Sequence, residues 1–160
     1  MGLADWLKEF RQLHERYKRG QVVGTELATY RGGRDELARA LLAAQHVLVK
    51  QGEVPRRQLR VARALQAEVD FGKEKVRAMT LDVSPGGFAA LMARPPVPGD
   101  QVKVSLRLPG QDPVTGVALV VDVKVQPGNA RASFAFRPLP EAEAERLETF
   151  VFDAVLDQLA

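Results

Sequence analysis

Proline is unevenly distributed along this 160-residue chain, because all ten prolines lie at or after Pro55. Proline has no backbone N–H and disrupts helix interiors, so a long proline-free stretch favours helices. Residues 1–54 are also rich in Ala, Leu, Glu, Arg and Gln, which favour helix. The later residues carry repeated Pro and Gly turn signals between short apolar runs, a pattern typical of strands. We therefore expect a helical N-terminal part followed by a β-rich part.

The N-terminal part predicts a helical hairpin. Apolar and aromatic residues recur there at steps of three and four, which indicates an amphipathic helix over residues 3–19; they are Trp6, Phe10, Leu13 and Tyr17. Gly20 is expected to end this helix, and Thr25 to act as N-cap of a second helix over residues 25–48. The pair Gly32-Gly33 lies inside the second helix, and the sequence leaves open whether the helix breaks there.

The second part contains six segments of strand-like sequence separated by turns, which predicts a small barrel or sandwich. The clearest segment is 102–108, where apolar and polar residues alternate. The first, 61–69, also tolerates helix between Ala62 and Glu68. The other strands are expected at 75–81, 88–92, 114–125 and 131–136. Residues 141–159 predict a closing helix with an apolar stripe. We expect a helical hairpin extension at 1–50, a linker at 51–55 and a β-rich domain at 56–160.

Composition excludes several kinds of chemistry. The chain has no cysteine and only two histidines, His14 and His46, so disulfides, cysteine-ligated metals and histidine-rich metal sites are excluded. We expect both histidines to be surface or packing residues, and we expect no metal site and no enzyme activity. No apolar run approaches the roughly 20 residues that a membrane span needs. The first residues lack a basic segment followed by an apolar core, so we expect a cytoplasmic protein without a membrane anchor.

Positive charge is concentrated in one short segment. The net charge of the chain is +3, but residues 55–63 alone carry four arginines and no acid. The residues before this segment sum to +2 and those after it to −3. A nucleic-acid duplex is usually bound by a spread basic face, whereas a single basic cluster suits a compact anion.

Two motifs carry complementary chemistry. The first is Arg56-Arg57-Gln58-Leu59-Arg60, whose planar guanidinium groups suit phosphate oxygens and the O6/N7 edge of guanine. The second is Asp82-Val83-Ser84-Pro85-Gly86-Gly87, expected in a turn after the second strand. Its carboxylate can accept from the N–H groups of guanine, Ser84 adds a hydroxyl, and Gly87 allows a close backbone approach. Together the motifs indicate a guanine nucleotide site, with no catalytic base or metal ligands required.

These two motifs, in this order and in a β-rich frame, resemble the PilZ domain family. The likeness covers roughly residues 55–160 and implies a mainly β fold with flanking helices: a six-stranded antiparallel β-barrel with a C-terminal helix, here preceded by the helical hairpin. It also implies that the domain binds the bacterial second messenger cyclic di-GMP (c-di-GMP) as a ligand, without any cofactor. Carried over residue by residue, the resemblance nominates Arg56, Arg60, Asp82, Ser84 and Gly87, with Arg57 as an additional contact.

The expected function is a c-di-GMP receptor in which binding changes the position of the N-terminal helices, and with it a protein-partner or homodimer surface. Three alternatives stay open. Asp82 and Ser84 can cap a turn by local hydrogen bonds, and Gly86-Gly87 can serve its backbone geometry. PilZ-like adaptors of motility machinery act without nucleotide. A nucleic-acid binder fits the basic segment but lacks an exposed aromatic pair for stacking. Effector partner, pathway, ligand stoichiometry and oligomeric state are not determined by the sequence.

Overall fold

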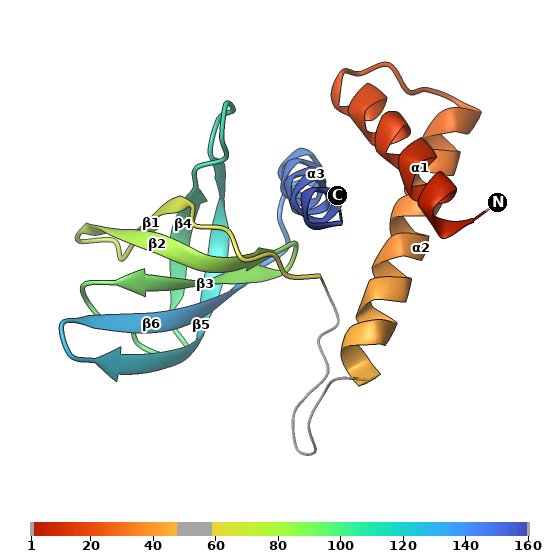
Figure 1. Ribbon diagram of the computed structural model, residues 1–160. Coiled ribbons are helices and arrows are strands. Elements are labelled where there is room, and N and C mark those ends of the chain that lie inside the picture. The colour runs from red at the N-terminus through yellow and green to blue at the C-terminus, as the bar shows by residue number, and fades with distance from the viewer. Residues whose placement is uncertain (1, 48–58, 160) are drawn as a thin grey trace. The chain divides into compact units, whose positions relative to one another are not determined.

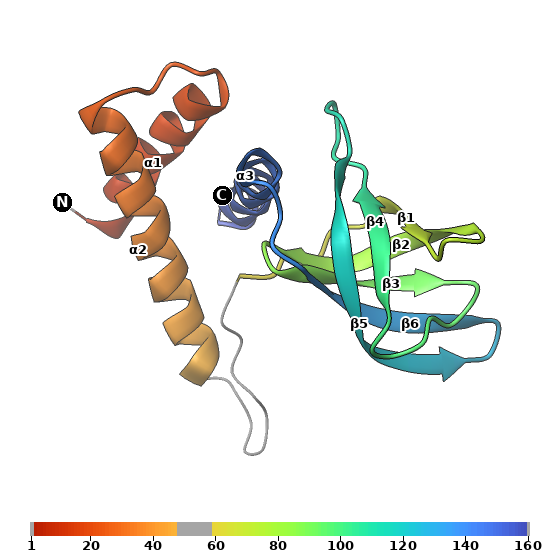
Figure 2. The ribbon, with the colours of Figure 1, turned by 180° about the vertical axis from the view of Figure 1, so that it is seen from behind.

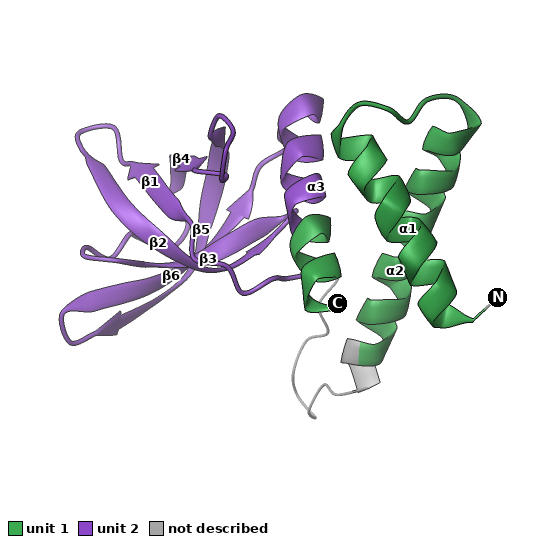
Figure 3. Cartoon of the chain, turned by 45° about the horizontal axis from the view of Figure 1, so that its top comes forward, with its two compact units in different colours: residues 1–59, 152–160 green, residues 60–151 purple. Residues whose placement is uncertain are grey.

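The computed structural model describes residues 2–47 and 59–159. The chain divides into two compact units, one formed by residues 1–59 with 152–160 and the other by residues 60–151 (Figure 3). The expected linker, residues 51–55, lies outside the described residues, so the expected boundary between hairpin and β-rich domain stays a prediction.

The first unit contains the expected helical hairpin, formed by α1 (Leu3–Lys18) and α2 (Thr25–Val47) (Figure 1). Gly20 ends α1 as expected: it has a φ of +72°, and its N–H donates to the carbonyl of Tyr17. The N–H of Gln21 donates to the carbonyl of Arg16, which completes a Schellman motif. The expectation for Thr25 was wrong by one residue, because Thr25 is already helical and the Gly24 carbonyl accepts from the N–H of Ala28.

The helix α2 runs through Gly32 and Gly33 without a break, which answers the question that the sequence left open. A Cβ at Gly33 would lie 3.0 Å from two ring atoms of Phe10, so the missing side chain lets α1 approach α2 closely. The expected aromatic stripe of α1 is packed here: Trp6 stacks on Phe10 at 5.2 Å between ring centroids, and Tyr17 stacks on Tyr30 at 4.3 Å. Packing therefore retains a glycine that weakens the isolated helix.

The second unit is a closed antiparallel barrel, as expected (Figure 1). Within the described residues it has six strands: β1 (Gln66–Asp70), β2 (Lys75–Ser84), β3 (Gly87–Met92), β4 (Gln101–Leu106), β5 (Val114–Gln126) and β6 (Asn129–Phe136). Their order around the barrel is β1-β2-β3-β6-β5-β4. The view from behind shows β4 and β5 side by side (Figure 2), and β4 closes the barrel by pairing with β1.

Alternation of apolar and polar residues fills the barrel interior. On β4, Val102, Val104 and Leu106 are buried and the residues between them are more exposed. Phe134 is also buried, and its ring stacks on Phe88 at 4.8 Å, in agreement with its expected core position. Phe136, expected on the same face, is only half-buried because it lies at the end of β6. Alternation with a period of two therefore identified the interior positions of β4 and β6.

Several strand boundaries differ from expectation: β4 ends at Leu106 and not at residue 108, and β6 begins at Asn129 and not at residue 131. The first strand was expected from Val61 but begins at Gln66; Val61 forms only an isolated bridge with Val83. Residues 62–65, the first part of the segment 62–68 that also tolerated helix, lie outside the ladder, and residues 66–68 lie in β1. The strand β2 is longer than expected and continues through Ser84.

The C-terminal helix α3 (Glu141–Gln158) belongs to both units: residues up to Val151 group with the barrel and those from Phe152 onward with the hairpin (Figure 3). Within the first unit, Lys18 of α1 donates to the Asp153 carboxylate at 2.6 Å, and a guanidinium N–H of Arg11 donates to the carbonyl of Leu156 at 3.0 Å. The cationic side of α1 thus holds the acidic end of α3.

Candidate functional site

The structure brings Arg60, Asp82, Ser84 and Gly87 into the barrel unit, at the junction of β2, β3 and the segment that precedes β1. Arg56 and Arg57 lie outside the described residues. The second motif was expected in a turn, but Asp82 and Ser84 lie among the last three residues of β2, and Gly87 is the first of β3. Only Pro85 and Gly86 form the turn between them.

A pair of backbone hydrogen bonds places the first motif beside the second. Val61, the residue after Arg60, is buried, and its N–H donates to the carbonyl of Val83 at 2.9 Å. The N–H of Val83 donates back to the carbonyl of Val61, also at 2.9 Å. This antiparallel bridge sets Arg60 opposite Ser84 and Ala62 opposite Asp82, so Arg60 and Asp82 lie diagonally across the bridge, within reach of each other's side chains.

A β-bulge directs Asp82 away from the barrel interior. The pairing of β2 with β3 shifts between Thr80 and Asp82, so that Leu81 is the extra residue. In regular alternation Asp82 would face the interior with Ala78 and Thr80, both buried. After the bulge Val83 takes the interior position, with no exposed surface, and the Asp82 side chain is 20% exposed. An ionised carboxylate is thereby spared burial in an apolar core.

Arg60 and Asp82 form an ion pair across this junction. Nη1 of Arg60 lies 3.6 Å from Oδ1 of Asp82, and the Arg60 side chain is 43% exposed. An ion pair with this exposure contributes little to stability, about 0–1 kcal/mol, because water screens it. Both groups therefore remain accessible to a ligand that offers a phosphate to the guanidinium and N–H donors to the carboxylate.

Ser84 and Gly87 are bonded within the turn. The hydroxyl of Ser84 is buried and donates to the carbonyl of Gly87 at 3.2 Å. A Cβ at Gly87 would lie 2.0 Å from the carbonyl oxygen of Phe134 on β6. The backbone of Gly87 is not in the left-handed region, so the alternative that it serves the turn through a positive φ does not hold. Glycine is required because β3 and β6 approach closely here.

Thr80 is a residue of this junction that the sequence motifs did not reveal. Its buried hydroxyl donates to the carbonyl of Arg63 at 2.6 Å and accepts the N–H of Leu65 at 2.7 Å. The N–H of Thr80 also donates to the carbonyl of Leu65 at 2.9 Å. A polar side chain at an inward-facing position of β2 was the only signal in the sequence, and its partners become known only from the fold.

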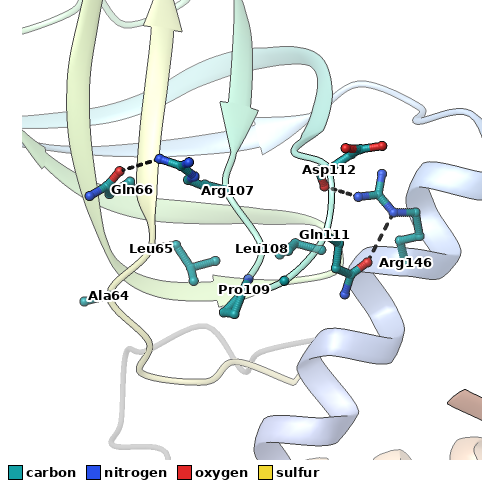
Figure 4. Close-up of a pocket in the computed structure, with 10 residues that line it drawn as sticks. Ala64, Leu65, Gln66, Arg107, Leu108, Pro109, Gln111, Asp112 and Arg146 are labelled. Carbon is teal, nitrogen blue, oxygen red and sulfur yellow. Dashed lines mark hydrogen bonds between the residues drawn. The ribbon is translucent and has the colours of Figure 1, made fainter.

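A separate hollow of about 930 Å³ lies between the start of β1 and the loop after β4 (Figure 4). Its walls include Arg107 and Arg146, but their guanidinium groups already have protein partners. Arg146 donates to Gln111 and to the carbonyl of Asp112, and Arg107 reaches Gln66 at 3.4 Å. None of Arg60, Asp82 and Ser84 lines this hollow. The bonds of Arg146 hold the loop after β4 against α3.

Two further observations concern residues 2–47 and 59–159. No group of three or more His, Cys, Asp or Glu side chains is placed there to hold a metal ion. No helix in the same part of the chain combines the length and apolar character that a membrane crossing requires.

Several solved structures share this fold. The inhibitor of motility MotI/DgrA of Bacillus subtilis matches with a TM-score of 0.61 and 16% identity, over 68% of this chain and 55% of that one. The PilZ domain of Escherichia coli YcgR, solved with c-di-GMP, matches with a TM-score of 0.56 and 16% identity, over 66% and 95%. The K. pneumonia MrkH–c-di-GMP complex matches with a TM-score of 0.60 and 19% identity, over 67% and 55%.

The aligned part therefore spans about half the length of MotI/DgrA and of MrkH. A comparison with the curated proteins finds no match to this chain. The family model described as "PilZ domain" matches residues 55–153, which is more than half of the chain and includes both motifs and all six described strands. With the closed barrel and the junction of its two motifs, this match shows that the chain belongs to the PilZ domain family.

Proposed function

We propose that this chain is a receptor for c-di-GMP and acts without catalysing a reaction. The proposed ligand contacts come from both motifs: Arg56, Arg57 and Arg60 on one side, and Asp82, Ser84 and Gly87 on the other. Membership of the PilZ family supports the proposal, as do the c-di-GMP complexes of YcgR and MrkH, which have the same fold.

The observation that carries the proposal is the distance of 3.6 Å between Arg60 and Asp82. Two motifs more than twenty positions apart present a fixed cation and a fixed anion at one exposed junction. A guanine nucleotide needs both, because its phosphate accepts hydrogen bonds and its base edge donates them. The Arg60–Asp82 contact is weak enough for these groups to exchange partners on binding.

The proposed mechanism joins the two motifs through the ligand. Phosphate oxygens accept hydrogen bonds from the arginines of the first motif, and each charge-assisted hydrogen bond contributes about 1.5–3 kcal/mol. After the entropic cost of immobilising the ligand and the side chains that contact it, a net binding free energy of about −8 kcal/mol corresponds to a micromolar dissociation constant. Because the first motif follows α2 in the chain, binding changes the N-terminal helices and a partner or homodimer surface that they form.

Isothermal titration calorimetry with c-di-GMP tests the site. We expect micromolar binding by the wild-type chain, and a loss of affinity of at least about tenfold in Arg60→Ala and in Asp82→Ala, since each removes a charged hydrogen-bonding group. Arg94→Ala is the matched control, because Arg94 is an exposed arginine paired with Glu74 away from the junction. Circular dichroism confirms that each variant is folded.

A charge-reversed double variant, Arg60→Asp with Asp82→Arg, separates ligand binding from the ion pair itself. It retains opposite charges at the junction but presents each to the wrong part of the nucleotide, so we expect a folded protein that does not bind. Wild-type affinity in both alanine variants, or in the reversed pair, would overturn the site assignment.

The second candidate function is an adaptor that works through protein contacts without nucleotide. The pairing of Arg60 with Asp82 favours it, because each charge already has a partner within the protein. A thermal shift experiment decides between the two: a ligand that binds the folded state raises its melting temperature. No shift at c-di-GMP concentrations far above micromolar supports the adaptor, whereas a shift that saturates supports the receptor.

A further inference from the structure

The segment between Arg60 and β1 leaves the barrel ladder and is then held by a side chain. Val61 pairs with Val83, and the regular pairing of β1 with β2 resumes at Gln66 with Met79. The intervening stretch, 62–65, is one residue longer than the opposite stretch of β2, 80–82. Regular strand pairing is therefore impossible between these two points.

The mismatch leaves backbone groups that the ladder does not pair, and Thr80 supplies partners for them. One hydroxyl donates to the carbonyl of Arg63 and accepts the N–H of Leu65, at 2.6 and 2.7 Å. The Thr80 side chain is 1% exposed, so water does not replace these bonds readily. A buried backbone group that loses its hydrogen-bond partner destabilises the fold. The Thr80 hydroxyl therefore keeps residues 62–65 in one conformation.

We propose that Thr80 is a positioning residue for ligand binding: its hydroxyl fixes residues 62–65 and thereby holds Arg60 within reach of Asp82. The Thr80 hydroxyl is bonded to the backbone of Arg63 and Leu65, so it acts on Arg60 through the backbone. It stands two positions before Asp82, at the bulge that turns Asp82 outward. Thr80 therefore fixes the backbone that follows Arg60, next to the bulge that turns Asp82 outward.

The first experiment needs no ligand and tests the positioning alone. In Thr80→Val, which keeps the shape of the side chain but removes the hydroxyl, we expect the amide of Val61 to exchange at least tenfold faster, measured by NMR relative to amides of β4. The Val61 amide donates to the carbonyl of Val83 and not to Thr80. Faster exchange of this amide therefore shows that the backbone next to Arg60 has moved, and not merely that the Thr80 hydrogen bonds are lost. Thr80→Ser, which keeps the hydroxyl, should restore protection.

The second experiment measures c-di-GMP affinity by calorimetry and rests on the proposed function. We expect Thr80→Val to bind at least fivefold more weakly than wild type and Thr80→Ser to bind within twofold. If Thr80 acts through Arg60, the Thr80→Val substitution does not lower the affinity further in an Arg60→Ala background. The weak binding in that background is measured at high protein concentration. A purely structural role would lower affinity equally in both backgrounds.

The outcomes are distinguishable. Failure of the wild-type chain to bind c-di-GMP overturns the proposed function but leaves the exchange experiment to decide on the positioning role. Unchanged Val61 exchange in Thr80→Val, or an affinity loss of equal size with and without Arg60, overturns the role of Thr80. If Thr80→Val does not fold, Thr80→Ala replaces it, because the smaller side chain admits a water molecule to the unpaired groups.

Discussion

Gly87, a residue of the second motif, is required by the packing of the barrel itself. The motif pattern led us to expect glycine because a backbone approaches a ligand there, but the nearest obstacle to a side chain is the Phe134 carbonyl oxygen. Asp82 differs, because its carboxylate lies at a partly exposed position, where it pairs with Arg60. A substitution at Asp82 is therefore the better test of ligand binding, and a substitution at Gly87 is the better test of barrel stability.

We expect Gly87→Ala to destabilise the barrel by about 1–3 kcal/mol, the usual cost of inserting a methyl group into a packed site. Its Cβ would meet backbone, which cannot move aside as a flexible side chain can. Urea unfolding followed by circular dichroism measures the change. The control is Gly32→Ala, because Gly32 is helical with open space around it and alanine should stabilise α2 by about 0.5–1 kcal/mol. Equal stability of Gly87→Ala and wild type would contradict the expected clash.

At the scale of elements, the contact between α1 and the C-terminal end of α3 contains a buried titratable group. His14 was expected as a surface or packing residue, and it is a packing residue with 1% exposure. Its Nδ1 lies 2.8 Å from the Tyr30 hydroxyl and its Nε2 lies 3.4 Å from Asp153. Burial lowers the pKa of His14 below 6.5; Asp153 opposes this shift and Lys18 reinforces it.

This arrangement makes the hairpin unit less stable in mild acid. Below about pH 6.5 the unfolded chain binds a proton at His14 that the folded chain does not, so the free energy of unfolding falls as the pH falls until folded His14 also protonates. Trp6, the only tryptophan and a residue of α1, reports this unit by fluorescence during urea unfolding. We expect a lower urea midpoint at about pH 5.5 than at about pH 7.5.

Two variants check the assignment to His14. His14→Gln should make the pH dependence shallower. Asp153→Asn removes the main contact that raises the pKa of His14, so its pKa should fall further in an NMR titration. An unchanged pH dependence in His14→Gln would show that other groups are responsible.

At the scale of the whole molecule, α3 is the one described helix that contributes to both units. Leu147 and Val151, on its barrel part, have no exposed surface, and Asp153 and Leu156, on its hairpin part, contact α1. The chain therefore has two covalent connections between barrel and hairpin, one through α3 and one through the segment that follows α2.

We expect c-di-GMP to change the fluorescence of Trp6 with the same concentration dependence as binding measured by calorimetry. Trp6 lies in the hairpin unit, outside the barrel that carries Arg60 and Asp82, so the change reports coupling between the units. Arg60→Ala should abolish it at the same ligand concentrations. Light scattering on the same samples shows whether the coupled change alters the oligomeric state. Saturated binding without any fluorescence change would show that the hairpin does not respond.

The amino-acid sequence by itself determined the local features of this protein. Helical periodicity placed α1 and α2, alternation placed β4 and β6, and the paired motifs pointed to the PilZ family, because each of these signals lies within a few consecutive residues. Arg56 and Arg57, which lie outside the described residues, remain predictions from the sequence.

Tertiary structure decided the features that depend on distant partners. The bulge that turns Asp82 outward, the reason for glycine at position 87 and the hold of Thr80 on residues 62–65 each arise from pairing between separate strands. The same is true of α2: its two glycines weaken an isolated helix, but one of them, Gly33, allows close packing against Phe10. A local pattern cannot encode these outcomes, since their energies come from groups that meet only after the barrel and the hairpin have formed.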